Sequence, residues 1–214
     1  MQDIVIVCAG NYGREVYWCL QSNNEEMIQR GKEPAYNIIG FIDDNIHALD
    51  GYSLKIPILG KISEWKPIAH EKYALGVGTP KTKKRVTDIL KARGCSFINV
   101  ISSLALISPD IQIGEGCLIT MGSIVSSGVT CGDFVNINGS MICGGSTIES
   151  YSTTTGYSVV EAAVLHQGVF IGSKAVITQE CEIGNWSQVA AGSVVVDNVR
   201  PNVTVFGMPA QEIG

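Results

Sequence analysis

The chain has 214 residues, with 15 Lys and Arg against 20 Asp and Glu, 45% hydrophobic residues and 24 glycines. This length can bury one large core or two small ones, and the net charge of −5 argues against nucleic acid as the main partner. Seven cysteines without a C-x-x-C pair favour a reducing compartment over a disulfide framework or a zinc site. No apolar run reaches the roughly 20 residues of a membrane span, and the first residues are typical of a strand rather than a signal peptide. We therefore expect a cytoplasmic protein.

The first half of the chain is predicted to be an α/β domain. Residues 1–101 hold 13 Lys and Arg and 11 Asp and Glu, whereas residues 102–214 hold two and nine, which predicts a domain boundary between 101 and 102. Expected strands cover 4–8, 37–42, 73–77 and 97–100, and expected helices begin at 14 and cover 81–93. Alternating strands and helices of this length indicate a parallel sheet with helices packed on it.

The second half has a period of six residues. Aliphatic residues or cysteines recur in two series, which are Ile107, Ile113, Ile119, Val125, Cys131, Ile137 and Cys143, and then Val159, Leu165, Ile171, Ile177, Ile183, Val189 and Val195. A hexad repeat predicts a parallel β-helix, in which three hexads form one triangular coil and the aliphatic residues stack inward. Cys143 and Val159 are 16 residues apart where three hexads need 18. We therefore expect that two residues are lost within 144–158 and that a tightened or bulged coil absorbs the loss.

Glycines and polar residues follow the expected strands of the first half. They are Gly10, Asn11 and Tyr12 after the first strand, Asp43 and Asp44 after the second, and Gly78 after the third. The carboxyl ends of parallel strands form the usual ligand edge of an open sheet, so these residues are candidates for binding phosphate and sugar hydroxyls. The alternative is that they build only tight turns and solvated strand ends. The incomplete G-x-G-x-x-G spacing argues against a dinucleotide site, and most of the basic run 81–85 is expected to be a solvated helix face.

Three motifs of the first half, CAGNYGREV, FIDD and GVGTPK, accompany the repeat and the closing segment VAAGSVVVDNVRPNVTVFGMPAQEI. Together they resemble the bacterial hexapeptide-repeat family of sialic-acid O-acetyltransferases and UDP-4-amino-sugar N-acetyltransferases. The resemblance covers nearly the whole chain and implies a small Rossmann-like domain, residues 1–101, followed by a left-handed parallel β-helix, residues 102–214. It also implies a cytoplasmic homotrimer that transfers acetyl from acetyl-CoA to an amino or hydroxyl group of a nucleotide-linked or sialic-type sugar, without a metal.

The resemblance also assigns binding residues. The family's UDP-sugar positions correspond to Gly10, Asn11, Tyr12, Asp43, Asp44, Gly78 and, as a weaker match, Lys81. Its acetyl-CoA cleft lies between neighbouring β-helices and corresponds to corners of the repeat and the end of the stack, at Ser173, Ala191, Gly207 and Pro209. A lone subunit would therefore hold half of the donor site.

Acyl transfer needs a group that takes the proton of the attacking amine or hydroxyl. The resembled family uses a histidine seven residues after an asparagine. Asn138 matches this asparagine, but the seventh residue after it is Gly145. His166, the only histidine on the repeat, is either a polar corner residue or a substitute base oriented by Glu149 or Glu161. A β-helix carbonic anhydrase, which needs three zinc-binding histidines, is excluded by this count.

Two functions remain open at this point. The first is an acetyl-CoA-dependent sugar N- or O-acetyltransferase, and the second is a catalytically silent homologue that binds a nucleotide sugar or serves as a scaffold. The glycine at the base position distinguishes them, because glycine cannot carry a proton. Acetyl-CoA turnover in the presence of UDP-amino sugars is the corresponding test.

Overall fold

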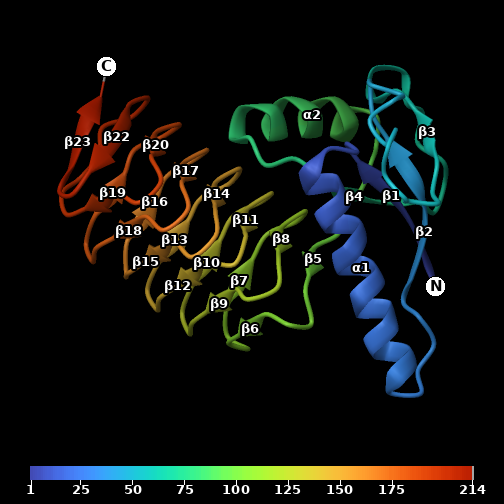
Figure 1. Ribbon diagram of the computed structural model, residues 1–214, viewed down its shortest axis with the longest axis horizontal. Helices are drawn as coiled ribbons and strands as arrows, with labels where there is room; N and C mark the ends of the chain where they lie inside the picture. Colours follow the sequence, from blue (N-terminus) through green and yellow to red (C-terminus); the bar gives the residue numbers. More distant parts are fainter. Residues whose placement is uncertain (214) are drawn as a thin grey trace.

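A computed structural model describes residues 1–213 of the chain. An α/β unit lies at one end of a long β-helix, and the C-terminus lies at the other end (Figure 1). The α/β unit has a four-stranded parallel sheet in the order β3-β2-β1-β4. Its elements are β1 (Gln2–Val7), α1 (Asn11–Gln29), β2 (Tyr36–Ile42), β3 (Ile58–Gly60), the 3₁₀ helix η1 (Ile62–Glu64), β4 (Lys72–Leu75) and α2 (Pro80–Ala92).

The α/β unit confirms most of the expected elements. The apolar run of β1 is buried on both faces, as expected for a central parallel strand, and Val16 and Leu20 of α1 pack on the sheet. The short edge strand β3 was not expected, and the expected strand over 97–100 is wrong. Only a single bridge joins Phe97 to Tyr73, and the next strand, β5 (Val100–Ile101), pairs with the β-helix.

The β-helix has three faces of short parallel strands. The first face consists of β5, β8 (Leu118–Ile119), β11 (Asn136–Ile137), β14 (Thr153–Thr154), β17 (Phe170–Ile171), β20 (Gln188–Val189) and β22 (Thr204–Gly207), which ends in a hairpin with β23 (Ala210–Ile213). The second face consists of β6 (Leu106–Ile107), β9 (Ile124–Val125), β12 (Met141–Ile142), β15 (Val159–Val160), β18 (Val176–Ile177) and β21 (Val194–Val195). The third face consists of β7 (Gln112–Ile113), β10 (Thr130–Cys131), β13 (Thr147–Ile148), β16 (Val164–Leu165) and β19 (Glu182–Ile183).

The second residue of each of these two-residue strands points inward and forms a continuous core. This confirms the predicted inward positions except Cys143 and Val159. Their neighbours Ile142 and Val160, both fully buried, pair with each other and fill these places. Between them, Ile148 and Thr154 are also fully buried inward residues, outside the two predicted series.

The register shows why the expected deletion is misplaced. Strands β11 and β12 begin at Asn136 and Met141, and strands β15 and β16 begin at Val159 and Val164, a step of five residues in each case instead of six. One residue is therefore missing at each of two separate corners, 138–140 and 161–163, and residues 144–158 keep the regular step. Loss of a single corner residue shortens the turn and leaves the strand pairing intact, so no coil is bulged.

No helix among residues 1–213 is long and apolar enough to cross a membrane.

Candidate functional site

The turn after β1 brings the backbone close to the ligand edge of the sheet. A Cβ atom on Gly13 would lie 1.9 Å from the carbonyl oxygen of Cys8, so only glycine lets α1 begin this near the strand. Cys8 itself adopts a left-handed conformation with φ 71°. Gly10 and Asn11 follow it and are exposed at the start of α1, as expected for residues that face a ligand.

Asp43 and Asp44 both stabilise this edge through backbone amides. The two carboxylate oxygens of Asp43 accept hydrogen bonds from Ala9 N at 2.7 Å and Asn45 N at 2.8 Å. Asp44 is exposed, and its Oδ1 accepts from Ser63 N at 3.0 Å and Ser63 Oγ at 2.9 Å. The hydrogen bond from Ser63 N is the main cause that lowers the pKa of Asp44. Asp43 therefore joins the loops after β1 and β2, and Asp44 joins the loops after β2 and β3.

Tyr12 and Gly78 lie against each other at the boundary with the β-helix. A Cβ atom on Gly78 would lie 2.1 Å from the Tyr12 ring, so the ring covers this glycine. Burial raises the pKa of the Tyr12 phenol, which keeps it neutral near pH 7. The ring and the loop after β4 together form the wall that the α/β unit presents to the first face.

Two adjoining hollows run between this wall and the first face. One, of about 240 Å³, includes Thr79 and Lys81, and the other, of about 500 Å³, includes Tyr12; both share Phe170 and Gln188. We call their combined space the interdomain groove. Its lining residues are Tyr12, Thr79, Pro80, Lys81, Thr155, Gly168, Phe170, Gly172, Ser173, Trp186, Gln188, Val189, Ala190, Ala191 and Thr204.

The groove brings together residues predicted for two different ligands. Tyr12 and Lys81 were expected to contact the sugar nucleotide, and Ser173 and Ala191 were expected to contact acetyl-CoA. Ser173 and Ala191 are exposed at the corner between the first and second faces, one coil apart. Gly207 and Pro209 lie in the β22–β23 hairpin at the end of the stack, outside the lining of the groove.

The predicted catalytic positions lie on three different corners. Asn138 follows β11 at the corner between the first and second faces, where its amide donates to Thr154 O at 2.9 Å. Gly145 lies between β12 and β13, and His166 lies between β16 and β17. A single protomer therefore does not assemble Asn138, Gly145 and His166 into one site.

The shortened corner also moves the base position. In a regular coil the seventh residue after Asn138 is the second residue after the next inward residue. The inward residue here is Ile142, so Gly144 takes that place and Gly145 lies one residue beyond it. Gly145 as the base position stays a prediction. Gly145 is instead the corner residue with φ +79°, stacked in the same column as Gly128 with φ +73°. Gly144 and Gly145 are both exposed, and neither has a side chain that can hold a proton.

His166 is held by carboxylates on both sides. Its Nδ1 lies 3.0 Å from Glu149 Oε1 and its Nε2 lies 3.1 Å from Glu182 Oε2. The hydrogen bonds from Glu182 and Glu149 raise the pKa of His166, because they favour the imidazolium. Its expected partner Glu149 is confirmed, whereas Glu161 lies at another corner. Because both ring nitrogens contact carboxylates, we propose that His166 joins successive coils, and its role as a substitute base stays a prediction.

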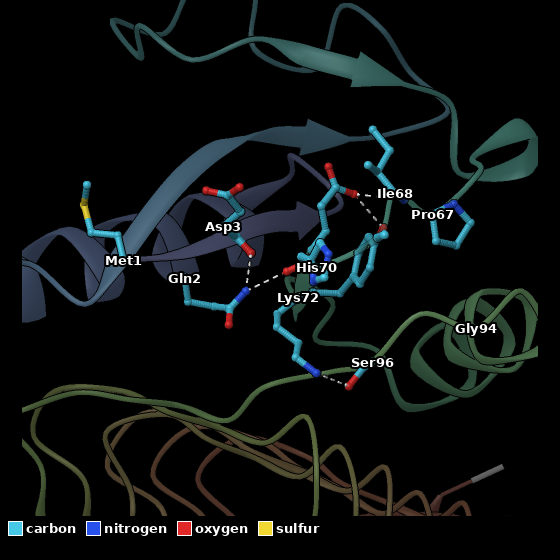
Figure 2. A pocket seen from close by; sticks show the side chains of 12 residues that line it. Met1, Gln2, Asp3, Pro67, Ile68, His70, Lys72, Gly94 and Ser96 are labelled. Atoms are coloured by element: carbon cyan, nitrogen blue, oxygen red, sulfur yellow. Dashed lines mark hydrogen bonds between the residues drawn. The ribbon is translucent and has the colours of Figure 1, made fainter.

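A separate hollow of about 660 Å³ lies at the opposite edge of the α/β sheet, beside the first residues of β1 and β4. Figure 2 shows its side chains, where Gln2 Nε2 donates to His70 O at 2.8 Å and Lys72 Nζ to Ser96 Oγ at 2.9 Å. None of the sequence-predicted binding residues lines it. Because ligands of open parallel sheets bind at the carboxyl ends of the strands, the interdomain groove is the better candidate.

Comparison with known proteins assigns the first unit. Residues 3–90 match the model of the PglD N-terminal domain. The α/β unit is therefore similar to the PglD N-terminal domain family. Within curated sequences, the chain is 34% identical over 107 residues to a serine acetyltransferase of Buchnera aphidicola, a match that covers 49% of the chain and 36% of that relative. The chain thus matches little more than a third of the length of such relatives.

Solved structures match the whole chain. The acetyltransferase domain of PglB from Neisseria gonorrhoeae has a TM-score of 0.86 at 19% identity, with 100% of both chains covered. WeeI from Acinetobacter baumannii has a TM-score of 0.82 at 24% identity, also with 100% of both chains covered. PerB from Caulobacter crescentus, solved in complex with CoA and GDP-perosamine, has a TM-score of 0.83 at 20% identity and covers 100% of this chain and 98% of its own. The expected fold, a small Rossmann-like α/β domain followed by a left-handed β-helix, is confirmed.

Proposed function

We propose that the protein is an acetyl-CoA-dependent acetyltransferase that acts on an amino or hydroxyl group of a nucleotide-linked or sialic-type sugar. The observation that carries this proposal is the interdomain groove, which joins the nucleotide edge of a PglD N-terminal domain to the corners of a β-helix. The structure of PerB with CoA and GDP-perosamine supports the pairing of these two ligands on this fold. UDP remains our first choice of nucleotide, and GDP and dTDP are the alternatives to test.

The groove can bind both substrates through the residues described above. Gly10 and Asn11 are exposed at the edge where a diphosphate would lie, and Lys81 supplies a positive charge at the groove. Ser173 and Ala191 are small and exposed, so the β-helix corner has room for an extended pantetheine chain beside them. In the reaction, the sugar nitrogen or oxygen attacks the thioester carbon, the C–S bond breaks, CoA leaves as its thiolate, and the nucleophile releases a proton.

The acceptor of that proton is not among the lining residues. Within the described part of the chain, the groove is lined by no carboxylate and no imidazole. This observation, together with Gly144 and Gly145, favours one competing function, a silent homologue that binds a nucleotide sugar without turnover. It also agrees with a site that a neighbouring subunit completes.

We propose a homotrimer with the second face as the contact between subunits. The outward residues of its six strands are all aliphatic or methionine, whereas those of the third face are mostly polar. The outward residues of the second face are Leu106, Ile124, Met141, Val159, Val176 and Val194. Leu106 and Met141 are exposed and the other four are half-buried, and such an apolar strip is typical of an interface between subunits. All seven cysteines are free thiols, which supports the proposed cytoplasmic location.

The test is thiol release from acetyl-CoA in the presence of UDP-, GDP- and dTDP-linked 4-amino sugars and of free sialic acid. Acetylated sugar formed in step with free CoA supports the proposal. Binding of a nucleotide sugar without turnover favours the silent homologue, and a failure to bind any of them contradicts both. Sedimentation of the wild type and of Val176→Lys tests the interface, since a wild-type monomer contradicts the trimer.

A further inference from the structure

The outward residues of the first face change in character along the stack. Near β5 and β8, Val100 and Leu118 are apolar and pack into the core of the α/β unit. Toward the other end, Phe170, Gln188 and Thr204 line the interdomain groove. The two residues between these groups are Asn136 on β11 and Thr153 on β14, both polar and at most 1% exposed.

Asn136 and Thr153 bond to the loop that follows β4. Asn136 Nδ2 donates to Val77 O at 3.0 Å, and Thr153 Oγ1 donates to Gly78 O at 2.7 Å. Two successive coils therefore hold two successive carbonyls of one loop. Because the next residue, Thr79, lines the groove, these bonds determine where one wall of the groove stands.

Lys83 makes the reciprocal contact from α2. Its side chain is fully buried, and its Nζ donates to Phe134 O at 2.8 Å and to Ser152 O at 2.9 Å. These carbonyls belong to the same two successive coils as Asn136 and Thr153. Burial lowers the pKa of Lys83. Lys83 lies on the same helix face as Val86, Thr87 and Leu90, so the expectation of a solvated basic face does not hold for it.

We propose that Asn136, Thr153 and Lys83 form an interdomain clamp that positions the nucleotide edge over the β-helix. The clamp rests on the proposed function, in which one groove holds both substrates. It sets the coil at which the α/β unit docks, and so the span between a sugar nucleotide on the Thr79 wall and a thioester at the Ser173 corner. The three side chains act through the loop rather than on a substrate, and they are positioning residues.

Four hydrogen bonds between buried groups make this contact stiffer than an apolar one. If a clamp side chain is replaced, the loop carbonyl that it bonded loses its partner and does not regain water. Movement of the loop away from the β-helix then lowers the free energy. Small displacements matter for transfer between two bound substrates, because a misplacement of about 1 Å can cost on the order of a hundredfold in rate. Binding of each substrate alone depends on its own half of the groove and is not affected.

The experiment compares Thr153→Val with Thr153→Ser, which keeps the hydroxyl, and with Thr147→Val, the same exchange on the third face. We expect Thr153→Val to lower kcat about ten- to a hundredfold, with the Kd for CoA and for the nucleotide within about twofold of wild type. Thr153→Ser and Thr147→Val should resemble wild type. Among these three variants, only Thr153→Val should accelerate amide hydrogen exchange at residues 78–82. Asn136→Leu serves as a second clamp variant if Thr153→Val fails to fold.

Unchanged kcat and unchanged exchange in both clamp variants would overturn the proposal. So would a parallel loss of CoA affinity, because it would place Thr153 at the donor site or show general unfolding. If the wild type transfers no acetyl group, the proposed function fails, but hydrogen exchange still decides whether the clamp holds the loop. Accelerated exchange in that case supports the clamp as a structural contact and contradicts its role in transfer.

Discussion

The carboxylates around His166 predict a pH-dependent contribution to stability rather than to catalysis. Replacing His166 by Gln removes two contacts of 3.0 and 3.1 Å that join three successive coils of the third face. The side chains of Glu149 and Glu182 are 42% and 58% exposed, so each pair is screened by solvent. Exposed ion pairs contribute about 0.2–1 kcal/mol each, so we expect His166→Gln to lower the free energy of unfolding by about 0.5–2 kcal/mol at pH 5.5.

The direction of the pH effect follows from the raised pKa of His166 in the folded protein. A group whose pKa is higher when folded stabilises the fold fully below its unfolded pKa, about 6.5, and loses this contribution as the pH rises through the folded pKa. The difference between wild type and His166→Gln in urea unfolding should therefore shrink as the pH rises above about 6.5. His47→Gln, which breaks one exposed contact to Asp50, is the matched control.

Activity measurements on the same variant separate a structural His166 from a catalytic one. We expect kcat of His166→Gln to stay within about threefold of wild type, because neither ring nitrogen is free to accept a proton. A loss of a hundredfold or more in kcat, with a stability difference that does not vary with pH, would refute this reasoning. It would restore His166 as the base.

Three further predictions test the groove and the register. Ala191→Trp should abolish CoA binding while leaving nucleotide binding intact, whereas Ala92→Trp, on the exposed end of α2, should change neither in calorimetry. Asp43→Ala should weaken nucleotide affinity about tenfold or more by releasing the turn after β1, with CoA affinity unchanged, and equal affinities would remove Asp43 from the site. In urea unfolding, Ile142→Ala should lower the free energy of unfolding by about 2–5 kcal/mol and Cys143→Ala by less than about 1 kcal/mol. The reverse order would mean that Cys143, not Ile142, points into the core.

Much of the β-helix could be predicted from the sequence, because inward positions tolerate only residues that fill a narrow core. The prediction failed where the chain lost single residues at corners, since a fixed step of six then selects Cys143 and Val159 in place of Ile142 and Val160. Thr154 hides the true register further, because it is a polar residue at a fully buried inward position.

The ligand edge could be located from the sequence, but its connection to the β-helix could not. Gly78 marks a close approach whose partner, the Tyr12 ring, is set only by tertiary packing. Lys83 carries a local signal, since it lies three and seven residues before Val86 and Leu90 on the buried face of α2. The pair of carboxylates around His166 could not be predicted, because Glu149 lies 17 residues before it and Glu182 16 residues after it. Only the coil geometry brings them together.

The central claim, that one groove presents a nucleotide sugar to acetyl-CoA, is tested most directly by a single-turnover reaction. Stoichiometric protein is mixed with acetyl-CoA and a UDP-, GDP- or dTDP-linked 4-amino sugar, and mass spectrometry follows the acetylated sugar while a thiol dye follows free CoA. We expect equal amounts of both products with at least one of these nucleotides, and loss of both in Ala191→Trp. Release of CoA without acetylated sugar, or no product although both substrates bind to the protein, would contradict the claim.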